Sequence, residues 1–368
     1  MDHCLPEDIR EIADRLGSDA QAYSGAKILL CGGAGFLGRY FASVFADLNA
    51  RVLDRPCRVT VCDNLITSGE AGRKQDKQPS GFQFLQHDIS RLLGLEEEMD
   101  YIIQAAGIAS PYYYRKYPLQ TLEAATLGTK RMLELGIAHP LKGFLFFSSS
   151  EIYGDPDPRS VPTPETYRGN ISCLGPRACY DESKRLGETL CQIYHERHGV
   201  PASIVRPFNV YGPGMQETDY RVLPNFASRI LKHQPLHVYG SGNQTRTFCY
   251  VTDAIAGFLK VLVRGRRGEA YNIGNPVPEV SMLQLAKSLE EVMGRPIAIK
   301  QVAYPETYPG DEPQRRCPDI RKAMADVGYR PSVGLNEGLR RFMAWAKRSY
   351  GAGKAARRPA RRRNRAAA

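Results

Sequence analysis

The chain has 368 residues, a formal net charge of +11, and hydrophobic and charged fractions of 42% and 24%. These values are typical of a soluble globular protein that is large enough for two lobes. No apolar run approaches the ~20 residues that cross a bilayer, and the acidic N-terminus lacks the apolar segment of a secretory signal. Nine cysteines without a CxxC pair favour reduced thiols and disfavour a zinc site. We therefore expect a cytoplasmic protein that neither enters a membrane nor holds a metal.

The positive charge is concentrated at the C-terminal end. Residues 354–368 contain seven Lys and Arg and no acid, so the remaining 353 residues carry only about +4, which is 11 minus 7. We predict a disordered basic tail over 351–368. Such a tail could bind a phosphate-rich partner or an anionic surface. Because the rest of the chain is not notably basic, the composition makes nucleic acid an unlikely partner.

The first segment, residues 1–26, is predicted to form a helical arm that ends near Gly17. This arm would pack on the main domain or on a partner subunit. Its apolar face consists of Ile9, Ile12, Ala13 and Leu16.

A glycine-rich turn follows the first predicted strand, in the sequence KILLCGGAGFLG at 27–38. Gly32, Gly35 and Gly38 let the backbone turn sharply and approach a pyrophosphate, and the next helix presents free N–H groups to it. Taken alone, the motif is weak evidence for such a site, because a turn between two core elements can have the same glycines.

A helix over 39–48, a loop over 49–57 and a second strand over 58–62 come next. Asp63 and Asn64 follow that strand. An acidic residue here can accept hydrogen bonds from the adenosine ribose and repels a 2′-phosphate, which favours NAD over NADP. The alternative is an ordinary aspartate in a loop.

Three further strands are predicted over 82–86, 101–104 and 143–147. Small or polar residues follow each of them: Asp88 and Ile89, then 105–107, then 148–151. Helical patterns separate the strands, notably over 118–139. Strands that alternate with helices predict an α/β fold with a doubly wound parallel sheet of the Rossmann type, whose ligands bind at the carboxyl ends of the strands.

Tyr180 and Lys184 stand four residues apart in the sequence YDESK, so they share one face of a helix. A nearby ammonium is expected to lower the pKa of a phenol from about 10. Tyr180 could then accept the proton of an alcohol while a nicotinamide receives the hydride, with the Ser149 hydroxyl bound to the same oxygen. Tyr-x-x-x-Lys is also common on ordinary helices, so its meaning depends on the glycine turn and the strand ends.

Together these motifs make the chain resemble an extended short-chain dehydrogenase/reductase of the nucleotide-sugar epimerase/dehydratase class, over roughly residues 27–346. The resemblance is carried by GGAGFLG, Asp63-Asn64, Asp88-Ile89, SSSEIYG, YDESK, RPFNVYGPG, RTFCYVTD and YNIGNP. Within this class the chain is most similar to UDP-glucuronate decarboxylases, through ASPYYY at 109–114, Ser149-Ser150-Glu151, the stretch 165–185, and QTRTF at 244–248.

The resemblance implies a set of site residues. The implied catalytic residues are Tyr180, Lys184, Ser149, Glu151 and Arg246. The implied NAD-binding residues are Gly32, Gly35, Phe36, Leu37, Gly38, Asp63, Asn64, Asp88, Ile89, Ala105, Ala106, Gly107, Tyr180 and Lys184. The implied contacts to a UDP-linked sugar are Ser110, Tyr114, Ser150, Asn209, Arg221, Tyr239, Gln244, Arg246 and Arg316, with Arg315 as a rival to Arg316.

The implied reaction is decarboxylation of UDP-glucuronate to UDP-xylose through a 4-keto sugar, in a closed hydride cycle. Related 4,6-dehydratases carry an Asp where this chain has Ser150, which disfavours dehydration. The alternatives are a 4-epimerase, and a decarboxylase that releases the 4-keto pentose. A non-enzyme alternative is an NAD-binding regulator, which would have no need for the Ser149, Glu151, Tyr180 and Lys184 set.

The expected domain organisation follows the same resemblance. After the arm, an NAD-binding Rossmann domain spans 27–210, with later strands returning to it near 247–275. A mainly nucleotide-sugar-binding lobe spans 211–350. A homodimer is expected through helices near 119–138 and 180–198.

Overall fold

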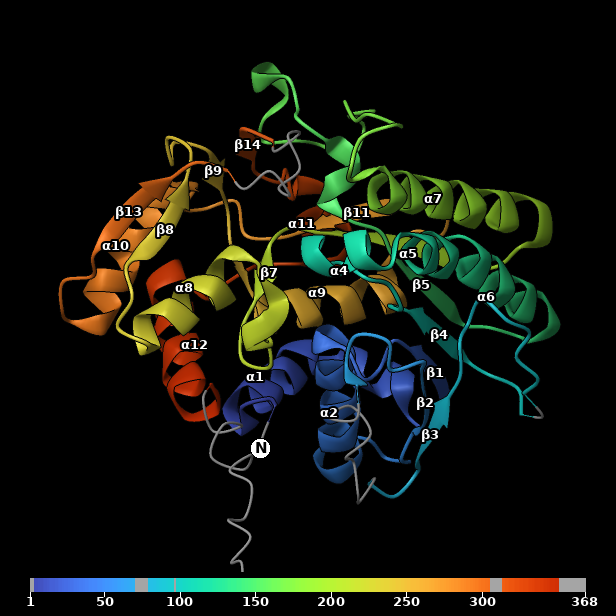
Figure 1. Cartoon of the computed structure of the whole chain (residues 1–368). Helices are drawn as coiled ribbons and strands as arrows, with labels where there is room; N and C mark the ends of the chain where they lie inside the picture. The colour runs from blue at the N-terminus through green and yellow to red at the C-terminus, as the bar shows by residue number, and fades with distance from the viewer. Residues whose placement is uncertain (1–2, 70–78, 96, 305–312, 351–368) are drawn as a thin grey trace, which may run out of the picture.

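The computed structural model describes residues 3–69, 79–95, 97–304 and 313–350 (Figure 1). The predicted basic tail at 351–368 lies outside the described residues. Within them, seven parallel strands form the central sheet, in the order β11-β6-β5-β4-β1-β2-β3. Their bounds are β1 (Lys27–Cys31), β2 (Arg58–Asp63), β3 (Phe82–Gln86), β4 (Tyr101–Gln104), β5 (Gly143–Phe147), β6 (Ala202–Pro207) and β11 (Ala270–Ile273).

The sheet confirms the predicted Rossmann-type architecture. All five predicted strands form, and three of them have the predicted bounds. The strand order reverses between β1 and β4, and ligands of doubly wound sheets bind at such a reversal. The carboxyl ends of these strands therefore fix where a site can lie.

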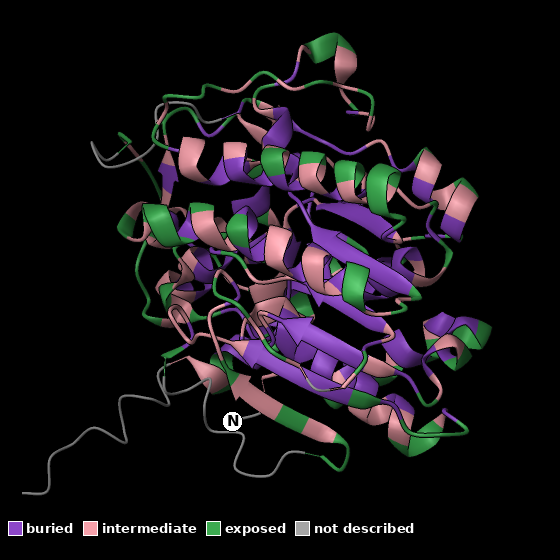
Figure 2. Cartoon of the chain, turned by 90° about the vertical axis from the view of Figure 1, so that its right-hand side faces the viewer, coloured by how far each residue is buried: buried purple, intermediate pink, exposed green. Residues whose placement is uncertain are grey.

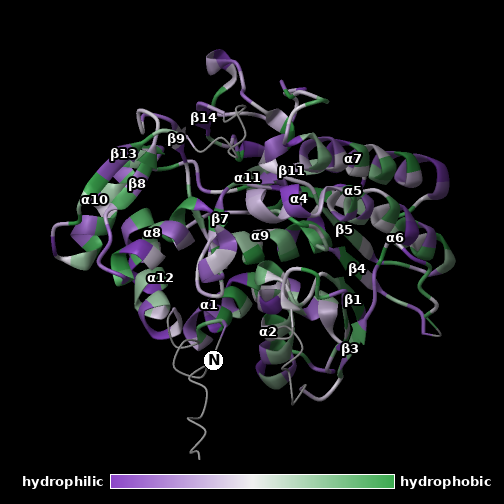
Figure 3. Ribbon diagram, in the orientation of Figure 1, coloured by the Kyte–Doolittle hydropathy of each residue, from purple (hydrophilic) through white to green (hydrophobic). Residues whose placement is uncertain are grey.

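Helices cover both faces of the sheet, because successive side chains of a strand point to opposite faces. On β1, Ile28 and Leu30 join a core with α2 (Phe36–Arg51) and α9 (Val251–Arg264). Leu29 joins the core under α6 (Leu127–Ala138) and α7 (Ala178–His198). Figure 2 shows the inner strands buried beneath helices whose outer faces are exposed, while the edge strand β3 is only partly buried. Figure 3 shows the hydrophobic residues of β4 and β5 in green. Each fully buried aliphatic side chain contributes roughly 1.5–3 kcal/mol relative to exposure.

The predicted helix over 118–139 is two helices, α5 (Pro118–Ala125) and α6, which is a correction. They meet at Thr126, whose φ of −109° and ψ of −75° depart from helical values. The hydroxyl of Thr126 donates to the carbonyl of Leu122 at 2.8 Å, a local bond that competes with regular helix geometry. The predicted helix over 39–48 is longer, because α2 continues to Arg51 and shortens the following loop.

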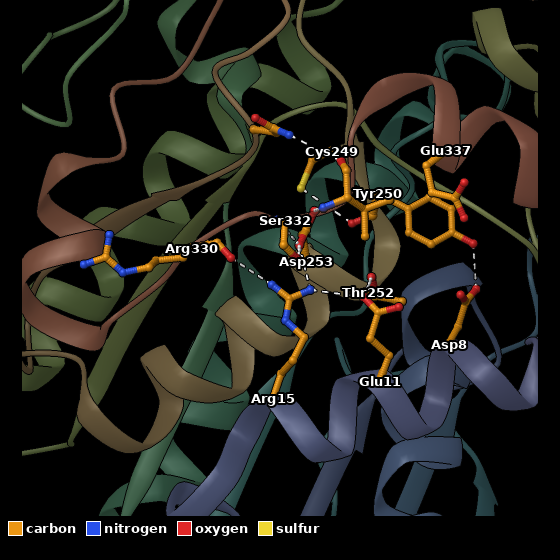
Figure 4. A network of polar contacts seen from close by, with 12 residues as sticks. Asp8, Glu11, Arg15, Cys249, Tyr250, Thr252, Asp253, Arg330, Ser332 and Glu337 are labelled. Carbon is orange, nitrogen blue, oxygen red and sulfur yellow. Dashed lines mark hydrogen bonds and ion pairs between the residues drawn. The ribbon is translucent and has the colours of Figure 1, made fainter.

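The N-terminal segment folds onto the main body. Helix α1 (Pro6–Leu16) ends at Gly17 as predicted, and its buried apolar face packs into the same core as α2 and α9. Polar side chains attach α1 to the main body (Figure 4): Arg15 pairs with Asp253 at 2.6 Å, and Tyr250 donates to Asp8 at 2.7 Å. Of the two packing alternatives, the structure therefore shows the main domain.

The second lobe is built from short strands and helices of the described residues that follow β6. Its strands are β7 (Val210–Tyr211), β8 (Leu236–Tyr239), β9 (Thr245–Arg246), β10 (Cys249–Tyr250), β12 (Val280–Ser281), β13 (Ile299–Val302) and β14 (Arg315–Arg316). Three of its helices are α8 (Val222–Leu231), α10 (Met282–Met293) and α12 (Leu335–Ser349), whereas α11 (Arg321–Val327) packs on β11 and α9 of the main domain. None of the helices that the structure describes is long and apolar enough to span a bilayer.

Candidate active site

One cavity of about 660 Å³ lies where the carboxyl ends of β1, β2, β4 and β5 face the second lobe. Every residue assigned above to NAD, to the sugar nucleotide or to catalysis lines it. Arg315 does not line it; its guanidinium pairs instead with Glu279 at 2.7 and 2.9 Å. Of the two rival arginines, only Arg316 therefore faces the cavity.

The turn between β1 and α2 forms a cradle in which side chains do not fit. Gly32 has a φ of +79°, and a Cβ there would lie 2.7 Å from the Cα of Ala106. A Cβ on Gly38 would lie 2.2 Å from the carbonyl oxygen of Gly32. The exposed N–H groups at the start of α2 and the positive end of its dipole suit a pyrophosphate. The cradle therefore fits the diphosphate of NAD.

Asp63 and Asn64 border the cradle at the end of β2. Asp63 accepts hydrogen bonds from the backbone N–H groups of Ala34 at 3.0 Å and Leu65 at 2.7 Å. Burial raises the pKa of the Asp63 carboxyl, and these two bonds oppose the rise. Asn64 donates to Asp88 at 3.2 Å, which joins the ends of β2 and β3. Each carboxylate oxygen of Asp63 keeps a second lone pair with which it could accept a ribose hydroxyl.

Tyr180 and Lys184 lie side by side on α7, beneath the strand end that carries Ser149. The Lys184 ammonium donates to the carbonyl of Phe147 at 2.7 Å and lies 5.7 Å from the centroid of the Tyr180 ring. The ring of Tyr114 stacks on that of Tyr180 at 5.5 Å. The structure therefore brings the three predicted chemical groups together at one wall of the cavity.

The expected depression of the Tyr180 pKa is wrong. Burial raises the pKa of Tyr180, although a hydrogen bond with Ser149 and the charges of Arg221 and Arg177 oppose the rise. Burial also lowers the pKa of Lys184 to about 8. The sequence places the two groups on one helix face but does not reveal that both are buried, and burial disfavours both charged forms.

Glu151 is held by two arginines, one of which the sequence analysis missed. Arg316 forms a fork with Glu151 at 2.5 and 2.7 Å, and Arg177 forms a second ion pair with it. Arg177 also pairs with Asp181 at 3.4 Å. Fork-shaped pairs fix geometry as well as charge. The Glu151 carboxylate is therefore positioned within the cavity by residues from two distant segments.

A buried network supports this wall from behind. Ser148 donates to Glu188 at 2.5 Å, and Arg206 donates to both oxygens of Glu188 at 2.8 and 2.6 Å. Arg206 also donates to Tyr153 at 2.7 Å, and Tyr153 donates to Asn272 at 2.7 Å. The end of β5 is thus tied to the outer strand of the sheet.

The second lobe supplies the polar groups on the other side of the cavity. Arg246 donates to the carbonyls of Thr245 at 2.8 Å and Gln314 at 3.4 Å, which orient its guanidinium.

Arg221 forms a fork with Asp219, with both contacts at 2.6 Å. Further polar contacts join Asn209 to the carbonyl of Thr247 at 2.9 Å and Gln244 to the carbonyl of Tyr239 at 3.3 Å.

Besides Arg177, the cavity wall holds residues that the sequence analysis passed over. Arg39 directly follows the third glycine, and its charge acts on Asp63. Tyr304 stacks on Tyr239 at 5.6 Å. Arg177 stands three residues before Tyr180 and Arg39 one residue after Gly38, so proximity to the motifs could have identified both. Tyr304 has no such signal, because its place depends on how the lobe folds.

These features define a nucleotide-sugar enzyme built on a dinucleotide-binding fold. The chain belongs to the NAD dependent epimerase/dehydratase family, whose model matches residues 28–274. UDP-glucuronic acid decarboxylase 5 of Arabidopsis thaliana is 39% identical over 317 residues, which are 86% of this chain and 88% of that relative. UDP-glucuronic acid decarboxylase 1 of Xenopus tropicalis is 38% identical over 327 residues, which are 88% of this chain and 72% of that relative. The predicted family is confirmed.

Solved structures agree with this assignment. The UDP-glucuronic acid 4-epimerase of Bacillus cereus, in complex with UDP-glucuronic acid and NAD, has a TM-score of 0.73 at 26% identity and covers 88% of this chain and 100% of its own. The dTDP-glucose 4,6-dehydratase DesIV of Streptomyces venezuelae, with NAD bound, has a TM-score of 0.76 at 26% identity and covers 88% of this chain and 98% of its own. The predicted fold and the predicted cofactor, NAD, are confirmed.

Proposed function

We propose that the protein is an NAD-dependent decarboxylase that converts UDP-glucuronate to UDP-xylose through a 4-keto intermediate. The observation that carries this proposal is that one cavity joins the dinucleotide cradle, the Ser149–Tyr180–Lys184 group and a set of arginines. Arginine suits both the diphosphate and the carboxylate of such a substrate, because its planar fork forms paired charge-assisted bonds. The curated decarboxylases at 38–39% identity support the same reaction.

The residues of the wall at α7 act on the C4 oxygen of the sugar. When bound, NAD supplies the acceptor and later the donor for the hydrogen on C4. Tyr180, hydrogen-bonded to Ser149, accepts the C4 hydroxyl proton and later returns it. Lys184 holds its ammonium beside the phenol. The cradle at Gly32 and Gly38 and the carboxylate of Asp63 fix the cofactor next to this wall.

Loss of CO2 needs no further cofactor once C4 is a ketone. The carboxylate carbon is then β to the carbonyl, so the C–C bond breaks and its electron pair moves onto the C4 oxygen as an enolate. Hydrogen bonds from Tyr180 and Ser149 stabilise that developing oxyanion. Glu151 governs the proton that C5 then receives, and Arg246 positions the substrate before the bond breaks. The sequence resemblance supports these two roles, and both side chains line the cavity.

A 4-epimerase remains the second candidate. It is favoured by the likeness to the Bacillus cereus UDP-glucuronic acid 4-epimerase. Such an enzyme shares the oxidation at C4 but keeps the carboxylate. A product of unchanged mass with inverted C4 would establish this candidate instead.

The test is incubation of the purified protein with UDP-glucuronate and NAD, followed by mass spectrometry of the nucleotide sugar. We expect a product that has lost CO2. Tyr180→Phe keeps the ring that stacks on Tyr114 and removes the proton acceptor, so it should bind NAD normally and lose at least about 10²-fold in turnover. A fully active Tyr180→Phe variant would refute the catalytic role of this residue.

A homodimer and a cytoplasmic setting stay predictions. The predicted dimer surface is supported by apolar side chains that are exposed on α5, α6 and α7: Leu119, Leu122, Leu127, Ile137, Leu186 and Ile193. Because water-exposed apolar patches commonly mark association sites, these helices are the expected place of contact. The domain boundaries near 210 and 350 likewise stay proposals.

A further inference from the structure

Two segments from different lobes meet at the mouth of the cavity. Ser110 in the loop after β4 donates to the backbone carbonyl of Asp219, 109 residues later, at 2.7 Å. Close to this bond, the rings of Tyr112 and Tyr220 pack with their centroids 4.5 Å apart. Both rings line the cavity, and with exposed fractions of 41% and 54% they also reach solvent. They therefore stand at its rim.

The backbone of Tyr220 is strained in a way that this contact explains. Tyr220 has a φ of +61° and a ψ of 0°, a left-handed conformation that disfavours a residue with a bulky side chain. The residue is 54% exposed, so core packing does not compensate for the strain. What this conformation achieves is the packing of the ring on Tyr112. Strain of this kind is concentrated at sites with a function.

The same two segments carry residues of the reaction centre. Two residues after Tyr112, Tyr114 stacks on Tyr180. One residue after Tyr220, Arg221 is held by Asp219 in a fork, and its charge acts on Tyr180. If these two segments moved apart, the wall at which C4 is oxidised and reduced would therefore be disturbed.

We propose that Tyr112 and Tyr220 form a clasp that slows release of the nucleotide sugar and keeps the 4-keto pentose bound until C4 is reduced. The need for such a device rests on the proposed function. After CO2 leaves, the sugar has lost the charge that arginine can hold, so retention depends on the UDP moiety and on closure of the rim. A clasp made of two rings packed at an angle of 35° holds a neutral sugar in place without requiring a charge on it.

The decisive variant is Tyr220→Gly, which removes the ring and relieves the left-handed strain. We expect UDP to dissociate about tenfold faster from this variant than from the wild type, the order of effect that one aromatic pair supplies. Tyr112→Ala should give the same increase, and the double variant little more, because both remove one contact. Tyr220→Phe keeps the ring and should release UDP at the wild-type rate.

His233→Gly is the matched control, since His233 also has a left-handed φ, of +55°, but does not line the cavity. It relieves comparable strain and should leave UDP release unchanged. Equal UDP dissociation rates in the wild type, Tyr220→Gly and Tyr112→Ala would overturn the clasp, whatever reaction the enzyme catalyses.

Turnover provides the second readout. With UDP-glucuronate and NAD, the two clasp variants should consume substrate while the fraction that ends as 4-keto pentose and NADH rises about tenfold. An unchanged fraction would contradict the role in retention. If the wild type retains the carboxylate, the proposed function fails, and UDP release still decides whether the clasp exists.

Discussion

Arg177 is the residue whose role the structure changes most. It forms one of the two ion pairs that hold Glu151, with a side chain that is only 9% exposed. Because a small displacement of a positioned group can cost about 10²-fold in rate, Arg177→Ala should lower kcat by roughly 10–100-fold and change the KM for UDP-glucuronate little. Arg177→Lys keeps the charge but cannot contact Glu151 and Asp181 through separate nitrogens, so it should recover part of the loss.

The control for this prediction is Arg159→Ala, which removes a surface ion pair with Asp157. A wild-type kcat in Arg177→Ala would show that Arg316 alone positions Glu151. Equal loss in the lysine and alanine variants would locate the effect in the paired contacts to Glu151 and Asp181 rather than in the charge.

Lys184 illustrates a conflict between stability and function. Its buried ammonium has a pKa of about 8, below the ordinary value of 10.5. Between these values the unfolded chain binds more protons than the folded chain, so this residue makes stability rise with pH. At pH 7 the buried ammonium of Lys184 is charged, so the full free-energy cost of burying that charge lowers the stability of the folded protein. Lys184→Met should raise the free energy of unfolding by roughly 1–3 kcal/mol at pH 7 while abolishing turnover.

Urea denaturation at neutral pH and near pH 10 checks this prediction. The difference between Lys184→Met and the wild type should shrink at the higher pH. Lys287→Met, on an exposed side chain, is the control and should change little at either pH. A less stable Lys184→Met variant at pH 7 would mean that the bond to Phe147 outweighs the cost of the buried charge.

At the scale of elements, helix α1 is joined to the second lobe by charge. Asp8 accepts a hydrogen bond from Tyr250 on β10 and one from Arg341 on α12, with Glu11 nearby on its own helix. Burial raises the pKa of Asp8 from 3.8 to about 6 despite these partners. Folded protein therefore keeps the proton up to about pH 6, whereas unfolded protein loses it near 3.8.

Because the pKa of Asp8 is raised in the folded protein, the free energy of unfolding falls as the pH rises from about 4 to 6. Above pH 6 the full cost of burying the charged carboxylate is present. Asp8→Asn should remove this dependence, so the stability difference between variant and wild type should change by roughly 1–3 kcal/mol between pH 7 and pH 4. Thermal or urea unfolding at several pH values measures it. Asp14→Asn, on an exposed side chain of the same helix, is the control. A difference that stays constant with pH would contradict the buried titration.

The elements that the sequence predicts well are those with a strong local signal. β1 and β5 are apolar runs followed by glycine and serine respectively, so the positions of both strands, the bounds of β5 and the residues that follow them could be predicted. The break at Thr126 was missed because Pro118 to His139 has one continuous helical pattern, and only the packing of Gly128 against Ile89 and the back-bonded Thr126 interrupt it.

At the scale of the whole molecule, the sequence predicts which residues line the same cavity. It does not predict how deeply they are buried or which charges lie beside them. All the assigned residues line one cavity, because strand ends of a parallel sheet converge. The direction of the Tyr180 pKa shift and the pairing of Glu151 with Arg177 depend on burial and on segments that meet only after folding. The contact between Tyr112 and Tyr220 is of the same kind.

In the proposed reaction the sugar is oxidised at C4, loses CO2, and is reduced again at C4 in one cavity. The most direct test uses UDP-glucuronate deuterated at C4, incubated with the protein and NAD, with the product analysed by mass spectrometry and NMR. We predict a UDP-pentose that has lost CO2 and carries the deuterium at C4. A product that retains the carboxylate with inverted C4, or a decarboxylated UDP-pentose without deuterium, would contradict the account.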